Sequence, residues 1–203
     1  MNAITDTAVL RAHFGAPSER AVLKQLDHLD PHCRAFIALS PFLVLATTDG
    51  AGNVDASPRG DAPGFVRVLD DHTLLLPDRP GNRRIDSLRN ILANPGVGLI
   101  FFVPGIDETV RVNGPARVTT DPALLATLEA QGKTPATAVL MTVREAYYHC
   151  AKALIRSKLW DPATRIERKS FPSLGRILAD QLGGLSVPET EASIDNAYKT
   201  ALY

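Results

Sequence analysis

The chain has 203 residues, 45% of them hydrophobic, and its 22 basic and 22 acidic residues give a formal net charge of zero. This composition excludes a disordered or fibrous chain, and a balanced charge disfavours nucleic acid as a partner. No apolar stretch reaches the roughly 20 residues that span a bilayer. Charged residues also interrupt the start of the chain, so we expect no secretory signal, no membrane partner and a cytoplasmic location.

The first part of the chain predicts two helices followed by a β-hairpin. Residues 18–27 have an N-cap serine and apolar residues near one helical face, and a second short helix is expected after Pro31. Residues 42–48 then form a β-rich run, which a Gly-rich turn separates from a second run at residues 54–57. This pattern is typical of antiparallel pairing.

The middle of the chain predicts a second hairpin, a helix and two longer strands. Residues 66–69 and 73–76 flank a turn, and residues 84–93 have apolar positions at helical spacing, ended by Asn-Pro-Gly. Residues 97–103 are nearly all apolar, and residues 109–119 alternate with a Gly-Pro break. The hairpins again indicate an antiparallel sheet.

The last part predicts a helix from Asp121 to about Gln131, a half-buried strand at residues 138–148 and a helix-prone tail from Phe171. The order of elements does not alternate as in a doubly wound sheet, and it favours a barrel of about six antiparallel strands with flanking helices, an α+β fold. We expect one domain at 41–165, with helical extensions at 1–40 and 166–203, the latter packed on the same domain.

The most informative segment is Pro77–Ser87, where Arg79, Arg83 and Arg84 lie at a strand-to-helix junction. Unpaired N–H groups at the start of a helix and Arg side chains both bind phosphate oxygens. The alternative is a solvated helix start, although Arg in a first turn is electrostatically unfavourable. The segment therefore predicts either a phosphate site or a plain basic surface.

Two further segments have both functional and ordinary explanations. Ser57-Pro-Arg-Gly-Asp61 resembles a ligand rim, although an Arg59–Asp61 surface pair would explain it equally. Residues 152–160 carry Arg156 one turn before Trp160, which suits a flavin but also suits a solvated helix beside a packed ring. Cys33 and Cys150 lack zinc or disulfide spacing and are expected to be reduced thiols. No hydrolase elbow, P-loop or dinucleotide fingerprint is present.

Residues 42–103 resemble the FMN-binding part of the pyridoxamine 5′-phosphate oxidase-like superfamily, in the order hairpin, hairpin, basic junction, helix and apolar strand. The resemblance implies a split barrel that forms a homodimer, with cofactor sites at the interface. In that family a Ser-Arg-Lys triplet grips the FMN phosphate, and Asn82-Arg-Arg84 takes its place here. The Arg/His substrate signature of the true oxidases is not recognisable. The resemblance implies these cofactor-binding residues: Ser57, Pro58, Arg59, Pro77, Asp78, Arg79, Asn82, Arg83, Arg84, Thr109, Arg156 and Trp160.

Some of these positions depart from the family pattern or depend on the dimer. Thr109 stands where the true oxidases have Gln, and Arg156 and Trp160 would reach the site of the other subunit. The function implied is an FMN-dependent oxidoreductase acting on a small molecule, in which the cofactor performs the hydride chemistry. Two alternatives stay open, a flavin-binding redox sensor or carrier without turnover, and a barrel that holds a deazaflavin or a haem ligated by a residue such as His149.

Overall fold

The structure is a computed structural model that describes residues 3–203. Its helices and 3-10 turns are α1 Thr7–Phe14, α2 Glu19–Leu23, α3 Pro31–Leu39, α4 Asp86–Ala93, α5 Pro122–Ala126, α6 Lys152–Ser157, η1 Pro162–Thr164, η2 Arg168–Ser170, α7 Leu174–Leu182 and α8 Val187–Thr200. Its strands are β1 Phe42–Thr48, β2 Val54–Gly60, β3 Arg67–Asp70, β4 Thr73–Pro77, β5 Gly96–Val103, β6 Ile106–Thr119, β7 Ala138–Thr142 and β8 Glu145–His149.

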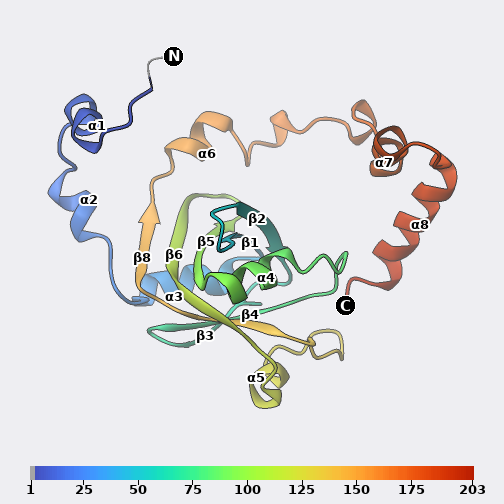
Figure 1. Cartoon of the computed structure of the whole chain (residues 1–203), viewed down its shortest axis with the longest axis horizontal. Coiled ribbons are helices and arrows are strands. Elements are labelled where there is room, and N and C mark those ends of the chain that lie inside the picture. Colours follow the sequence, from blue (N-terminus) through green and yellow to red (C-terminus); the bar gives the residue numbers. More distant parts are fainter. Residues whose placement is uncertain (1–2) are drawn as a thin grey trace.

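The strands form one curved antiparallel sheet in the order β2-β1-β5-β6-β7-β4-β3, and β8 pairs with β6 outside this path. Figure 1 shows this sheet at the centre, with α3 and α4 against it and α1, α2, α6, α7 and α8 around its outside. The fold is therefore mainly β with flanking helices, as predicted. No helix in the described part of the chain is long and apolar enough to cross a membrane.

Strand β6 holds the barrel together because its two halves have different partners. Its first half pairs with β5 and β8, and its second half pairs with β7. Gly114 lies where the partners change, and a Cβ atom there would collide with the carbonyl oxygen of Thr142. The Gly-Pro break in the sequence therefore marks a close approach of two backbones rather than the end of a strand.

The expected number of six strands was wrong, since the described part of the chain has eight. The segment predicted as one strand at residues 138–148 is two strands that pair with opposite halves of β6. The short strands of the second hairpin also join the sheet, through the pairing of β4 with β7. Strand pairing between distant segments set this number, and local sequence patterns do not report it.

Two helices are shorter than predicted. The expected helix at residues 18–27 ends at Leu23, because Leu26 pairs with Ala146 through two backbone hydrogen bonds of 3.0 and 2.8 Å. The helix expected from Asp121 to Gln131 ends at Ala126, and Gln131 lies at a positive φ of 53°. A tertiary backbone pairing and a tight turn therefore override the helical pattern.

The core fills the barrel from alternate strand positions. Leu43 and Leu45 on β1 and Phe101 on β5 have no exposed surface. Helix α3 begins at the N-cap Asp30, whose carboxylate accepts a 2.7 Å hydrogen bond from the Cys33 N–H, and it adds buried side chains to the same core, including Phe36. Helix α4 packs its buried Ile91 against this core, which fixes the position of the helix start.

Candidate functional site

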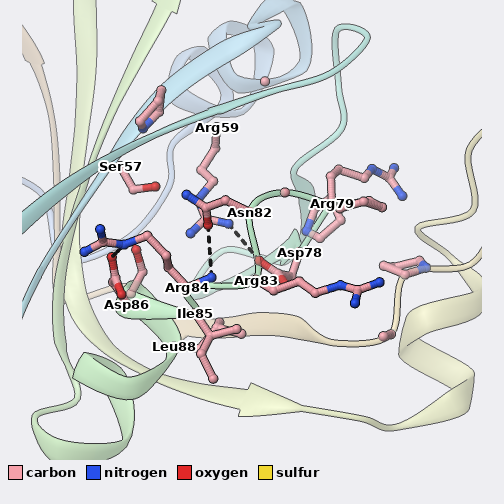
Figure 2. Close-up of a pocket in the computed structure, with 18 of the residues that line it drawn as sticks. Ser57, Arg59, Asp78, Arg79, Asn82, Arg83, Arg84, Ile85, Asp86 and Leu88 are labelled. Atoms are coloured by element: carbon pink, nitrogen blue, oxygen red, sulfur yellow. Dashed lines mark hydrogen bonds and ion pairs between the residues drawn. The ribbon is translucent and has the colours of Figure 1, made fainter. Parts of the chain in front are cut away.

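A cavity of about 780 Å³ lies beside the start of α4. Strand β2, the segment after β4, the first turn of α4 and a loop at residues 133–136 line it (Figure 2). Its volume is in the range of small-molecule and cofactor sites. Nine of the predicted cofactor-binding residues line it, namely Ser57, Pro58, Arg59, Pro77, Asp78, Arg79, Asn82, Arg83 and Arg84.

The backbone is strained where it enters α4. Arg83 has φ 61° and Ile85 has φ 54°, the left-handed region that costs an L-residue with a Cβ atom about 1–2 kcal/mol. Asn82 Oδ1 accepts a 3.0 Å hydrogen bond from the Arg84 N–H between them. The helix begins at Asp86 rather than at the predicted Arg84, and no side chain caps it. Its first N–H groups are therefore available to an anion from the cavity.

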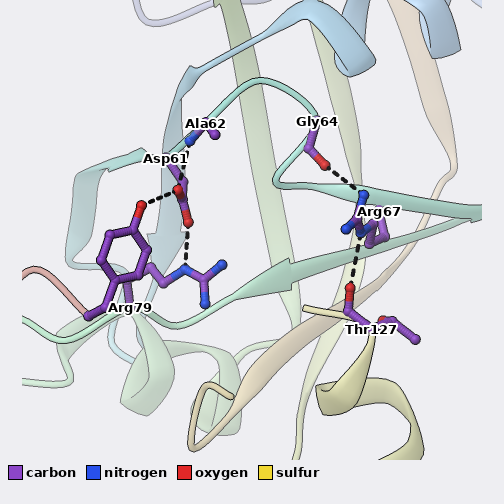
Figure 3. Close-up of polar contacts among 7 residues, drawn as sticks. Asp61, Ala62, Gly64, Arg67, Arg79 and Thr127 are labelled. Atoms are coloured by element: carbon purple, nitrogen blue, oxygen red, sulfur yellow. Dashed lines mark hydrogen bonds and ion pairs between the residues drawn. The ribbon is translucent and has the colours of Figure 1, made fainter. Parts of the chain in front are cut away.

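Two ion pairs cross between the end of β2 and the segment after β4. Arg59 Nη1 lies 2.7 Å from Asp78 Oδ1, and Arg79 Nε lies 2.7 Å from Asp61 Oδ2. Figure 2 shows Arg59 above Asp78 in the cavity, and Figure 3 shows the contact between Arg79 and Asp61. The expected alternative, a surface pair between Arg59 and Asp61, is wrong, because each of these residues pairs with the other segment. The crossed pairs join the two walls of the cavity.

The arginines at the start of α4 differ in their charge partners. Arg84 Nε lies 2.8 Å from Asp86 Oδ2. Arg83 forms no ion pair with any residue in the range 3–203, and its side chain lines the cavity. Of the four cavity arginines, Arg83 therefore has the charge most available to a bound anion.

Polar side chains on the inner face of α4 join this helix to β1 and β2. The Ser87 hydroxyl donates a 3.0 Å hydrogen bond to Asp55 Oδ2, and Asn90 donates a 3.0 Å hydrogen bond to the Thr47 hydroxyl. Ser87 is 2% exposed, and both Ser87 and Asp55 line the cavity. Neither Ser87 nor Asp55 was expected from the sequence. Their only sequence signal is a serine at an inward position of an amphipathic helix.

Tyr203 also lines the cavity, although it is far from the rest of the site in sequence. Its hydroxyl donates a 2.6 Å hydrogen bond to Asp61 Oδ1, and its ring centroid lies 5.5 Å from the Arg79 guanidinium carbon. The Lys133 ammonium donates a 2.7 Å hydrogen bond to the backbone oxygen of Tyr203. No sequence pattern indicated Tyr203 or Lys133, since a single tyrosine and a single lysine have no spacing to interpret.

Among the carboxylates that pair with the cavity arginines, Asp61 has the most buried side chain, which is 3% exposed. Burial alone would raise its pKa, but hydrogen bonds from Tyr203, the Ala62 N–H and Arg79 outweigh that effect and hold the pKa below its ordinary value of 3.8. The same hydrogen bond raises the pKa of the Tyr203 phenol. At neutral pH, Asp61 is therefore an anion that binds both Arg79 and a protonated Tyr203.

Three predicted residues do not line this cavity. Thr109 is 2% exposed within the sheet, where it lies opposite His149 in the β6–β8 register. The Trp160 indole donates a 2.9 Å hydrogen bond to the Ile106 carbonyl, and Arg156 is exposed on α6. Among residues 3–203, no group of three or more His, Cys, Asp or Glu side chains could hold a metal ion.

The chain is similar to several solved structures. The chain is similar to a single-residue variant of HupZ from Group A Streptococcus, with 17% identity, a TM-score of 0.50, and coverage of 60% of this chain and 99% of HupZ. An FMN-binding protein from Syntrophomonas wolfei has 12% identity, a TM-score of 0.44, and coverage of 58% and 83%. HutZ, the heme storage protein from Vibrio cholerae, has 16% identity, a TM-score of 0.43, and coverage of 60% and 93%.

No curated protein matches the chain. A family model described as pyridoxamine 5′-phosphate oxidase matches residues 29–150, which is more than half of the sequence. The matched residues run from the start of α3 to the end of β8 and include both walls of the cavity and the start of α4. The chain belongs to the pyridoxamine 5′-phosphate oxidase family.

Proposed function

We propose that this protein binds FMN in the cavity beside α4 and is an FMN-dependent oxidoreductase acting on a small molecule. The observation that carries the proposal is the uncapped start of α4, which faces a cofactor-sized cavity next to Arg83. Arg83 has no ion-pair partner among residues 3–203, and helix N–H groups and a guanidinium together suit a phosphate ester. Membership of the pyridoxamine 5′-phosphate oxidase family supports a cofactor role for this cavity.

The residues present fit the FMN phosphate. Arg83 would supply the charge, the first N–H groups of α4 would supply directed donors, and Asn82 holds the turn in shape through its hydrogen bond to the Arg84 N–H. Two carboxylates also lie here, but Asp86 is paired with Arg84 and Asp55 accepts from Ser87. Arg83 and Arg84 balance these two carboxylates in formal charge, so the binding of a dianion would depend on the N–H groups at the start of α4 together with the unpaired Arg83.

The rest of the cavity fits an aromatic ring system. Phe65, which is 8% exposed, and Leu88 contribute apolar surface, and Pro58 and Pro77 contribute rigid backbone on either wall. When bound, FMN would supply the hydride and electron transfer. The residues of this chain would bind the phosphate, orient the ring and exclude water from it. We assign no protein acid or base.

We further propose that the chain forms a homodimer with two cofactor sites at its interface. In that arrangement Arg156, which is exposed on α6 and does not line the cavity of its own chain, would reach the site of the partner. Trp160 is held to β6 by its indole hydrogen bond and would place α6 for this contact. Sedimentation of the native chain and of Arg156→Ala, with and without FMN, tests both parts.

Flavin is favoured over haem by the side chains of the cavity. A haem would need an axial ligand, and none of the described residues that line the cavity is a histidine, cysteine or methionine. The one tyrosine there, Tyr203, has its hydroxyl bonded to Asp61. His149 lies on β8 opposite Thr109, outside the lining. A deazaflavin would use the same phosphate contacts, so the titration described next includes one.

The experiment is the visible spectrum of the purified protein, followed by calorimetric titration with FMN, riboflavin, a deazaflavin and haem. Riboflavin lacks the phosphate, so we expect it to bind at least about tenfold more weakly than FMN, the loss of one or more charge-assisted hydrogen bonds. Equal affinity for both would reject the phosphate site. Stopped-flow reduction of the bound flavin by nicotinamide donors then separates an enzyme from a flavin carrier.

A further inference from the structure

Helices α7 and α8 form a hairpin outside the sheet. Gly175 on α7 lies so close to Glu191 on α8 that a Cβ atom at Gly175 would collide with it, which shows tight packing of the two helices. Within α7 only Gly175 is buried, and α8 has no buried residue. Figure 1 shows this hairpin on the periphery, with the chain returning after α8 toward the loop that precedes α4. The hairpin therefore has little apolar contact to hold it against the barrel.

A single residue supplies the polar contacts that hold residues 165–203, the arm that contains the α7–α8 hairpin, against the barrel. In the described part of the chain, every hydrogen bond between residues 165–203 and the sheet or its loops involves Tyr203. The phenol donates to Asp61, the ring lies over Arg79, and the backbone oxygen accepts from Lys133. The arm is thus attached at one point, and that point is in the cavity wall.

The attachment point of the arm is the ion pair between Asp61 and Arg79. Asp61 and Arg79 are held to each other at 2.7 Å, with side chains 3% and 16% exposed. A buried ion pair of this kind offers a fixed acceptor for the phenol and a fixed cation for the ring. Arg79 lines the cavity and Asp61 directly follows Gly60, which also lines it, so the position of Tyr203 and the shape of the cavity depend on each other.

We propose that residues 165–203 form a strap and that Tyr203 is its latch, closing the Arg79 end of the cavity and slowing the exchange of the ligand. The ligand part of this proposal rests on the function proposed above. The connecting segment before α7 carries the turn η2 at Arg168–Ser170 and has no buried residue, so it can serve as the hinge. The ligand enters or leaves when Tyr203 lifts from Asp61 and Arg79.

The latch is tested by hydrogen exchange of the full chain, read in peptides covering residues 187–203. Tyr203→Ala removes a hydrogen bond to a charged group, and Asp61→Asn replaces the charged acceptor with a neutral one, so both are expected to raise exchange there about tenfold. Peptides of β1 and β5 should be unchanged, which shows that the barrel is intact. Tyr203→Phe removes only the hydroxyl, and Tyr198→Phe, at an exposed tyrosine on α8, is the matched control. Wild-type exchange in both Tyr203→Phe and Tyr203→Ala would overturn the latch.

The closing experiment measures FMN dissociation by stopped flow in the same variants. Tyr203→Ala should release FMN about tenfold faster and also bind it faster, because opening of the strap limits both directions. A faster release with unchanged association would mean that Tyr203 only contacts the ligand, and unchanged rates would mean that the strap is not a gate; either result overturns the proposal. Failure of the wild type to bind any FMN would reject the proposed function, while the exchange measurement still decides whether Tyr203 anchors the strap.

Discussion

Arg59 Nη1 on β2 lies 2.7 Å from Asp78 Oδ1 in the segment after β4, and this pair joins the two walls of the cavity. The two side chains are 20% and 26% exposed. Losing one member of a pair this buried leaves an uncompensated charge. We expect Asp78→Asn to lower the free energy of unfolding by about 2 kcal/mol in urea. Asp180→Asn, in an ion pair exposed by 59% on both sides, should change it by less than about 0.5 kcal/mol, and equal effects would contradict this role for Arg59 and Asp78.

Arg83 should dominate the binding of the FMN phosphate. We expect Arg83→Ala to weaken FMN binding at least about tenfold in calorimetry, since it removes a charge-assisted hydrogen bond, and Arg83→Ala with Arg84→Ala to weaken it further. Arg89→Ala is the control, because Arg89 lies on the same helix and does not line the cavity. Unchanged flavin affinity in the double variant would show that the phosphate does not bind at the start of α4.

Asp86 should oppose the same ligand. Its carboxylate neutralises Arg84 at 2.8 Å and lies in the first turn of α4. Asp86→Asn would free Arg84 and remove a negative charge near the phosphate, so we expect FMN to bind about threefold to tenfold more tightly. The gain should shrink as salt is added, since screening weakens exposed charges. Weaker binding would show that Arg84 needs Asp86 to hold its position.

Ile85 should be strained. It occupies the left-handed region with φ 54° and ψ 26°, and the residue is 54% exposed. Ile85→Gly should raise the free energy of unfolding by about 1 kcal/mol, because relief of the left-handed conformation exceeds the added backbone entropy of the unfolded chain. Ile85→Ala keeps a Cβ atom and should show no gain in the same urea titration. A gain in both variants would point to the side chain instead of the backbone.

Cys33 should be unreactive and should make the fold sensitive to alkali. Burial, followed by the neighbouring Asp30, raises its pKa from 9.0 to about 12, whereas Cys150 is exposed. A thiol reagent should therefore modify Cys150 rapidly in the native chain and Cys33 only on unfolding. As pH rises from 9 toward 12, the unfolded thiol releases its proton and the folded thiol does not, so stability should fall by up to about 1.4 kcal/mol per pH unit.

The alkaline loss has its own control within the chain. Cys33→Ala removes the buried thiol and should flatten the decline of unfolding free energy above pH 9, although it leaves a small cavity at every pH. Cys150→Ala should keep the decline of the wild type. A decline that is the same in Cys33→Ala would mean that other groups cause it.

The sequence by itself determined the antiparallel barrel class, the family and nine residues of the two cavity walls. Hydrophobic alternation with turn residues marks hairpins locally, and the arginines between residues 79 and 84 mark a strand-to-helix junction. The tertiary structure decided which charged side chains form ion pairs with one another. Arg59 pairs with Asp78 rather than with Asp61, because β2 and the segment after β4 lie side by side only in the folded barrel.

The tertiary structure also decided the number of strands and the far end of the site. Residues 138–148 divide into β7 and β8 because the two parts of this segment pair with different halves of β6. Such pairing between distant segments leaves no local sequence pattern. Tyr203 reaches Asp61 across 142 positions of sequence. Spacing rules report neighbours along a helix or strand, whereas a contact over that separation is set by how the whole chain packs.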